Sequence, residues 1–212
     1  MLLIKLKDMS NIDFVNMHRY QAIEQIVYQK VKEWKPTTIV ELGHGSGALT
    51  VAASIALKEI NSKGKIHSYD IIGESSYELS GVKSDSRYNI KKRGLNKYVN
   101  FIEGDVFEKW VNEPFSFDLL IVDIDNTWEI LTKIFVDNKF INNEVKKGAK
   151  VLIEGGDPTH PRINNFTLDS FIKERNKLSS SWTSGFHSTD TISFKLTYLG
   201  GSGRTSISNL EL

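Results

Sequence analysis

The segment Thr38–Leu57, TIVELGHGSGALTVAASIAL, restricts the fold of this chain more than any other stretch. It joins an apolar, β-branched run to a long apolar helical segment, and Glu41 stands just before glycines at Gly43, Gly45 and Gly47. Glycine lets the backbone turn sharply and lets a ligand approach, and amides at the start of a helix favour a carboxylate or phosphate. A turn needed only for packing is the alternative. Three alternating glycines after an acid instead favour a cofactor-binding strand-to-helix turn.

Strands and helices alternate along the rest of the chain, which predicts a parallel sheet with helices on both faces. The tail from Thr191 reads as two further strands around a Gly-Ser-Gly turn. We therefore expect an α/β fold: a doubly wound, mostly parallel seven-stranded sheet with a C-terminal antiparallel hairpin. The parallel strands are expected over Thr38–Leu42, Lys65–Ile71, Tyr98–Asp105, Phe117–Asp125 and Ala149–Glu154. Helices are expected over Ala48–Ile60, Thr127–Asn138 and Phe166–Leu178. A polar connection is expected over Gly73–Asp85, followed by a further helix that ends at about Gly94.

A further helix is expected before the first strand. Apolar side chains recur at helical spacing within Asp13–Trp34, and Pro36 ends the run. Residues 1–35 are therefore predicted to form an N-terminal helical cap, and residues 36–212 the core. Both would belong to a single domain spanning residues 1–212, a length within the range of one α/β domain.

Composition narrows the class of protein. The formal net charge of +1 gives no support to nucleic acid as a partner, and the absence of cysteine excludes disulfides and thiolate metal sites. The apolar run at the N-terminus is too short for a signal peptide, and no stretch approaches a membrane-spanning length. A cytoplasmic protein without a membrane partner is expected.

Acids follow the second and third expected strands, at the sheet edge where a doubly wound fold binds its ligand. Asp70 could accept hydrogen bonds from both hydroxyls of a ribose, although by itself it could be a surface acid. Asp105 could accept a hydrogen bond from an adenine amino group. It could equally cap the next helix, and the two roles are compatible.

Further polar residues follow the fourth and fifth strands. Asp123 closes a buried strand, where an unpaired carboxylate would be costly, and this is the place for a residue that faces the reacting centre. Asp125 could be a solvated turn residue, and Asn126 could cap the next helix. The fifth strand leads into a polar loop in which His160 and Arg162 are candidate substrate contacts.

Taken together, these motifs resemble class I S-adenosylmethionine-dependent methyltransferases. VELGHGSG is similar to the first motif of that family, EGDV to its adenine-side motif and FDLLIVDID to its fourth-strand motif. KKGAKVLIEGGD and the terminal hairpin also fit, so the resemblance runs from about Pro36 to the C-terminus. It implies a transferase of class EC 2.1.1.- that uses S-adenosyl-L-methionine.

The resemblance also implies a role for each residue. Gly43, Gly45 and Gly47 would bracket the methionine portion of the cofactor, and Glu41 would lie near its amino group. Asp70 would hold the ribose. Asp105, with Val106 beside it, would bind the adenine, and Asp123 would lie near the methyl group.

A finer resemblance links LLIVDIDNTWEILTKIF to the fourth-strand segment of small-molecule O-methyltransferases. It implies methylation at oxygen of a small-molecule acceptor. In those enzymes a metal ion can bind acids after the fourth and fifth strands, and Asp123, Glu154 and Asp157 occupy comparable places here. The Asp-Asn pair of that family is not matched by EGGD, so we expect no metal and leave metal dependence uncertain.

Catalysis at a hydroxyl would also benefit from a general base. Asp123 and His160 are the candidates that we retain, beside His18 and His44. His44 lies inside the glycine turn and is expected to face solvent, and His18 is interpreted as an ordinary residue of an amphipathic helix.

Two alternative functions remain open at this stage. GHGSGA also fits the G-x-G-x-x-A pattern of NAD(P)-dependent oxidoreductases, although Glu41, Asp105 and the terminal hairpin disfavour that class. A catalytically silent cofactor-binding protein is the second alternative. The aromatic signature of amino-methylating enzymes is absent at the position of DIDN, which argues against methylation of nucleic-acid bases. Whether the protein forms a homodimer is left open.

Overall fold

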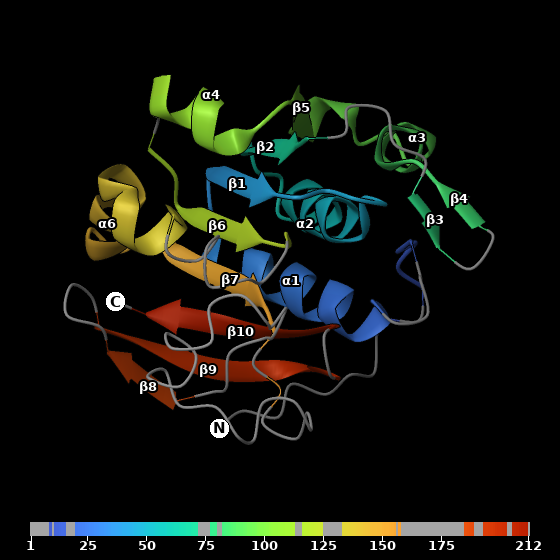
Figure 1. Ribbon diagram of the computed structural model, residues 1–212. Coiled ribbons are helices and arrows are strands. Elements are labelled where there is room, and N and C mark those ends of the chain that lie inside the picture. Colours follow the sequence, from blue (N-terminus) through green and yellow to red (C-terminus); the bar gives the residue numbers. More distant parts are fainter. Residues whose placement is uncertain are drawn as a thin grey trace.

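The computed structural model describes residues 9, 11–15, 20–71, 77–79, 82–112, 116–124, 133–155, 157, 185–188, 193–202 and 205–211. Its main feature is a mixed sheet of eight strands in the order β5-β2-β1-β6-β7-β10-β9-β8 (Figure 1). The first five of these strands are parallel, and the last three pair antiparallel. Their bounds are β1 (Thr38–Leu42), β2 (Lys65–Asp70), β5 (Val99–Glu103), β6 (Leu119–Val122), β7 (Lys150–Glu154), β8 (Gly185–Ser188), β9 (Ser193–Ser202) and β10 (Thr205–Glu211).

This arrangement confirms the predicted fold class. All five expected parallel strands are present, and the expected hairpin is β9–β10, whose second strand pairs with β7. Strand β8 extends the sheet beyond the seven predicted strands. The polar connection expected over residues 73–85 contains a small antiparallel pair, β3 (Tyr77–Leu79) and β4 (Val82–Ser84).

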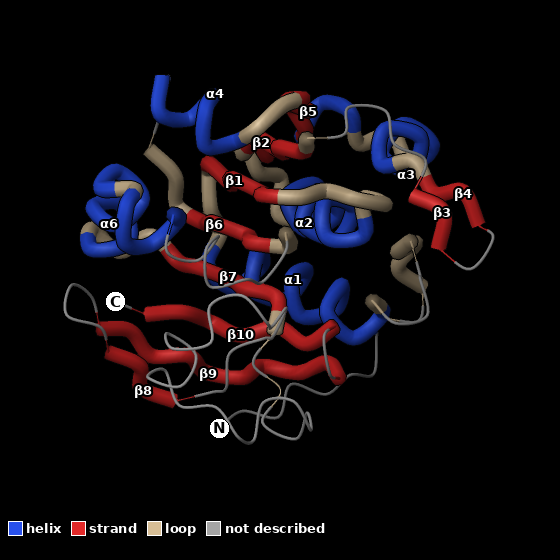
Figure 2. The backbone as a smooth tube through the Cα atoms, viewed as in Figure 1, coloured by secondary structure: helices blue, strands red, loops and turns tan. Residues whose placement is uncertain are grey.

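Helices cover both faces of the sheet (Figure 2). On one face lie α1 (Gln21–Trp34), α2 (Ala48–Glu59) and α3 (Ser86–Lys92), the last followed by a 3₁₀ turn at Asn96–Tyr98. On the other lie α4 (Val106–Asn112), a π-helical turn at Lys133–Asp137 and α6 (Lys139–Lys146). The expected helix over Thr127–Asn138 overlaps the π-helical turn, but its first residues, and the expected helix over Phe166–Leu178, lie outside the described residues.

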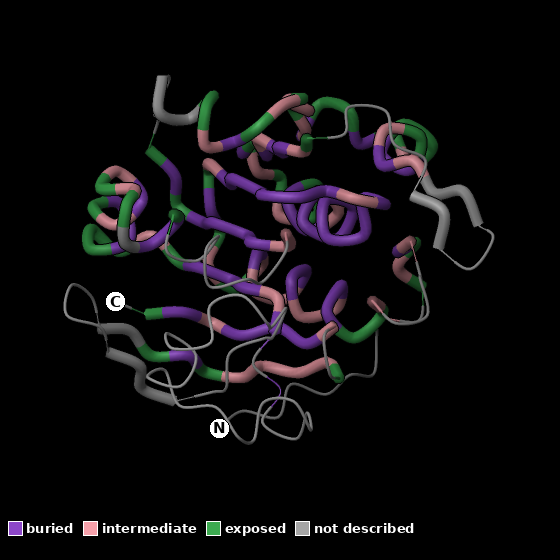
Figure 3. Tube along the Cα trace, viewed as in Figure 1, coloured by how far each residue is buried: buried purple, intermediate pink, exposed green. Residues whose placement is uncertain are grey.

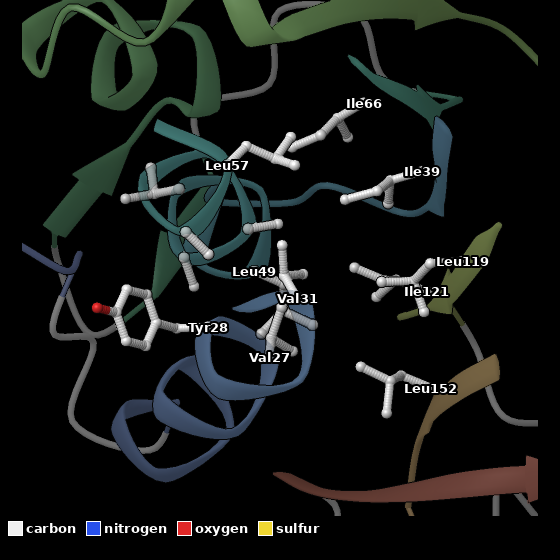
Figure 4. Packing of buried hydrophobic residues seen from close by; sticks show 14 of the residues in the cluster. Val27, Tyr28, Val31, Ile39, Leu49, Leu57, Ile66, Leu119, Ile121 and Leu152 are labelled. Carbon is white, nitrogen blue, oxygen red and sulfur yellow. The ribbon is translucent and has the colours of Figure 1, made fainter. Parts of the chain in front are cut away.

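Alternating side chains of the central strands pack against the helices on the two faces of the sheet. Leu119 and Ile121 of β6 pack with α1 and α2, as Figure 4 shows, whereas Leu120 and Val122 pack on the opposite face with α6. Strand β6 is therefore buried throughout (Figure 3). Such two-sided burial explains why this segment reads as a continuous apolar run.

Helix α1 belongs to the layer that covers the sheet. It packs beside α2 and also against β9 and β10. A Cβ on Gly200 would lie 2.7 Å from Ile26 Cδ1, and one on Gly201 would lie 3.0 Å from Ile23 Cγ2, so the glycines of β9 permit this close approach. The helix begins at Gln21 rather than near Asp13. Within the described part of the chain, no helix is long and apolar enough to cross a membrane.

Asp118 holds the starts of β1 and β6 together. Its Oδ2 accepts hydrogen bonds from Thr37 N (2.7 Å), Thr37 Oγ1 (2.6 Å) and Thr38 N (2.9 Å). Partial burial raises the pKa of Asp118, but these bonds outweigh it and hold the pKa below its ordinary value of 3.8.

We expect Asp118→Ala to lower the free energy of unfolding at pH 7 by about 1 kcal/mol, since the side chain is largely exposed. Because the folded-state pKa is lowered, this contribution is present above the ordinary pKa and is lost as the pH falls below it. Urea denaturation at pH 7 and pH 3 measures both effects. Equal stability of variant and wild type at pH 7 would contradict the assignment.

Candidate functional site

The glycine turn between β1 and α2 lies at the carboxyl end of the sheet, flanked by the ends of β2 and β6. Gly43, Gly45 and Gly47 have φ values of 82°, 45° and 81°, a region that glycine occupies without strain. A Cβ on Gly43 would lie 2.9 Å from the carbonyl carbon of Asp123, and closer still to its oxygen. The turn is thus packed against the backbone that follows β6.

Asp70, at the end of β2, organises this turn. Its Oδ2 accepts hydrogen bonds from the backbone N–H groups of His44 and Gly45, both at 3.1 Å. Gly43 N in turn donates to the carbonyl of Tyr69 at 2.8 Å. Asp70, the acid expected to hold a ribose, is therefore also hydrogen-bonded within the protein. Its partner is the turn that would bind the same ligand.

Glu41 is buried behind the turn, with 1% of its surface exposed. Its Oε2 accepts hydrogen bonds from Thr50 Oγ1 of α2 (2.7 Å) and Ser68 Oγ of β2 (2.5 Å). Its Oε1 has no hydrogen-bond partner among the described residues. Burial raises the pKa of Glu41 to about 8; the two hydroxyl donors oppose this rise, whereas the carboxylates of Asp123 and Asp70 add to it.

The expectation that His44 faces solvent is wrong. The side chain is 4% exposed, and its ring meets Phe101 of β5 edge to face at 5.1 Å between centroids. Burial lowers the pKa of His44, despite the nearby carboxylate of Asp70, so the ring is neutral at pH 7. A ring packed in this way serves the structure of the turn and is a poor candidate for a general base.

Asp105 caps α4, as one of its two predicted roles requires. Its Oδ1 accepts a hydrogen bond from Phe107 N at 2.8 Å. The residue is exposed, which leaves its carboxylate accessible to a ligand as well. The side chain of Val106 is buried in the core, so Val106 could contribute only its main chain to an adenine site.

The acids named for a metal lie at the ends of β6 and β7. Asp123 and Glu154 are half-buried, and Asp157 is buried, with its N–H donating to Ser206 Oγ at 3.2 Å. Among the described residues, no group of three His, Asp or Glu side chains is placed to hold a metal ion. The remaining candidates, His18, Asp125, Asn126, His160 and Arg162, lie outside the described residues.

Helix α3 supports the turn in a way that sequence reasoning missed. A Cβ on Gly47 would lie 2.9 Å from Ser86 Cα, and Asn89 Nδ2 donates to Ser46 O at 3.0 Å. Arg93 Nη1 donates to Asn89 Oδ1 at 3.1 Å. The Asp85 N-cap before a short apolar-polar run marks the helix in the sequence, but nothing local indicates that it supports the turn.

Comparison with known proteins places the fold of this chain among methyltransferase folds. No family model matches the chain. The O-methyltransferase of Bacillus cereus in complex with SAH superposes with a TM-score of 0.57 at 15% identity, covering 89% of this chain and 79% of that one. A putative O-methyltransferase of Klebsiella pneumoniae gives 0.55 at 14% identity (90% and 79%), and the SAH-bound Podospora anserina methyltransferase PaMTH1 gives 0.54 at 17% (89% and 77%). The chain therefore has the class I methyltransferase fold.

A local match to a curated protein also exists. A mitochondrial homoaconitase of Candida albicans is 32% identical over 121 residues, which span 54% of this chain. The chain covers only 16% of the length of that protein, so the likeness concerns one segment.

Proposed function

We propose that this chain is an S-adenosylmethionine-dependent methyltransferase that acts on a small molecule, with oxygen as the acceptor atom. The observation that carries the proposal is the glycine turn after the central strand β1. Asp70 fixes this turn, the start of α2 continues it, and Asp123 borders it. The O-methyltransferases among the similar structures support the same reading.

The residues present fit such a cofactor. Glu41 Oε1 is a buried carboxyl oxygen without a partner among the described residues, which suits a nearby ammonium group. Gly43, Gly45 and Gly47 would bracket the methionine portion, and the amides at the start of α2 favour its carboxylate. Asp70 would hold the ribose. Asp105 and the main chain of Val106 would hold the adenine.

When bound, this cofactor supplies an electrophilic methyl group for an in-line displacement, which is accelerated mainly by positioning. In this proposal the glycine turn and Asp70 fix the methyl donor, and Asp123 lies near the acceptor. Asp123 or His160 would then take the proton from an acceptor hydroxyl. Glu154 and Asp157 join Asp123 only if a metal ion takes part. Activity that survives excess chelator would remove the metal from the scheme.

Two alternatives are kept as outcomes of a binding experiment. An NAD(P)-dependent oxidoreductase would bind NAD, and a catalytically silent protein would bind S-adenosylmethionine without turnover. Isothermal titration calorimetry with S-adenosylmethionine, S-adenosylhomocysteine and NAD separates the first from our proposal. Binding of NAD and of neither sulfur compound would overturn it. Turnover with a panel of small phenols and alcohols separates the second.

Substitutions at Asp70 test the residue assignments. We expect Asp70→Asn to keep near wild-type stability, because the amide oxygen can still accept from His44 N and Gly45 N. It should nevertheless weaken cofactor binding about tenfold or more, since a charged acceptor is lost. Asp70→Ala should lose binding and about 1–3 kcal/mol of stability together.

Calorimetry and urea denaturation measure the two effects. Asp105→Asn, which keeps an acceptor for capping α4, is the matched variant on the adenine side. Wild-type cofactor affinity in both Asp70→Ala and Asp105→Ala would refute these assignments.

The remaining parts of the proposal concern the setting of the enzyme. A small-molecule acceptor is the expected partner, nucleic acid and membrane are not, and the protein is expected to act in the cytoplasm. Sedimentation at micromolar concentration tests whether it forms a homodimer.

A further inference from the structure

The carboxyl group of Glu41 has an asymmetric environment. One oxygen, Oε2, receives hydrogen bonds from Thr50 of α2 and Ser68 of β2. The other, Oε1, is shielded from solvent and has no partner within the described part of the chain. A buried carboxylate oxygen without a donor is costly, whereas a protonated carboxyl group carries no net charge to desolvate.

The charges around Glu41 disfavour its ionised form further. Asp70, from β2, and Asp123, after β6, add negative potential at this end of the sheet. His44, from the turn, is neutral at pH 7 and supplies no positive charge. No ion pair to Glu41 is found among the described residues, and α2 offers it only the hydroxyl of Thr50.

We propose that Glu41 is protonated in the cofactor-free protein at neutral pH and releases this proton to solvent when the ammonium group of the bound cofactor enters beside it. This inference rests on the proposed function. A cation placed next to three acids favours the ionised form of the most deeply buried one, because an opposite charge at short range lowers the pKa of a carboxyl group. Cofactor binding and deprotonation of Glu41 are then linked.

The linkage predicts how affinity depends on pH. With a pKa of about 8, Glu41 is about nine-tenths protonated at pH 7. The amino group of the ligand keeps its proton below about pH 7.7. Between pH 6 and pH 7 the affinity should therefore rise about eightfold. Binding at pH 7 should release about 0.7 proton per ligand, because Glu41 loses about 0.9 proton and the amino group of the ligand takes up about 0.2.

The experiment is calorimetry with S-adenosylhomocysteine, which carries the amino group but no transferable methyl. Titrations at pH 7 in phosphate and in Tris, whose ionisation enthalpies differ, give the number of protons released. We expect a net release of about 0.7 proton for the wild type and an uptake of about 0.2 proton for Glu41→Gln, which keeps the shape of the protonated side chain.

Two serine substitutions give a test that does not depend on binding by Glu41→Gln. Ser68→Ala removes a donor that favours the ionised form, so the rise of affinity should move to higher pH. Ser54→Ala is the matched control: Ser54 is also buried, but its hydroxyl donates to the carbonyl of Thr50 and does not touch Glu41. Its pH dependence should coincide with that of the wild type.

The outcomes separate this inference from the proposed function. If S-adenosylhomocysteine binds without proton release, or releases as many protons from Glu41→Gln, the linkage is refuted while the methyltransferase proposal stands. If no sulfur cofactor binds at any pH, both fall. Infrared spectra of the cofactor-free protein decide the protonation state directly, since the carbonyl band of a protonated acid should be present at pH 7 and absent from Glu41→Gln.

Discussion

Replacing Gly43 with alanine is expected to destabilise the protein by roughly 3 kcal/mol or more and to abolish cofactor binding. Two costs combine at this position. The φ of 82° is unfavourable for any residue with a side chain, and the added Cβ would lie 2.7 Å from Ile124 Cγ2 and closer to the backbone oxygen of Asp123. Because backbone atoms are involved, the turn itself would have to move away from β6.

Gly94→Ala and Gly148→Ala are the matched controls. Both glycines have positive φ, but a Cβ would meet nothing within 4 Å at either position. We expect each control to cost about 1 kcal/mol and to bind the cofactor normally, so the difference from Gly43→Ala isolates the steric clash. Urea denaturation and calorimetry measure the two effects. A Gly43→Ala protein that is as stable as the controls would show that the turn is not fixed against β6.

The contribution of Glu41 to the stability of the cofactor-free protein is expected to fall as the pH rises from about 5 to about 8. Its pKa in the folded state, about 8, lies above the ordinary value of 4.5. The folded state therefore holds one more proton than the unfolded chain in this interval, and stability falls with pH. A shift of this size corresponds to roughly 3–5 kcal/mol.

Comparison with Glu41→Gln removes the contributions of other groups. The difference in free energy of unfolding between wild type and variant should change steadily between pH 5 and pH 8.5, with the variant the more stable at the alkaline end. It should be constant above that range. Denaturation curves at half-unit intervals measure it. A difference that does not vary with pH would show that Glu41 is ionised throughout.

The sequence was sufficient to predict the strands and the glycine turn that build the site. The apolar runs at β1, β6 and β7 and the glycine turn are local signals, so the position of Asp70 and Asp123 at one edge of the sheet could be predicted. The cap formed by Asp105 was also predicted, because the residue and its helix are adjacent in the chain.

Features that depend on distant partners could not be predicted in this way. His44 was expected at the surface, but Phe101, 57 positions further along the chain, covers its ring. The asymmetry of the Glu41 carboxyl group also depends on distant residues. Thr50 and Ser68 lie on two different elements, and both donate to Oε2, which leaves Oε1 without a partner among the described residues. Strands β3, β4 and β8 have only three or four residues, too few for a periodic pattern to stand out.

The position of β10 has a consequence for the order in which the protein folds. This strand follows β9 in the chain, yet it lies between β7 and β9 in the sheet. Helix α1 packs on both β9 and β10. Its buried face is therefore fully shielded from solvent only after the whole β9–β10 hairpin has docked. Contacts that span most of the chain close slowly. A nascent chain on the ribosome would therefore expose part of α1 until β9 and β10 emerge, and chaperones that bind apolar helices would meet it in that interval.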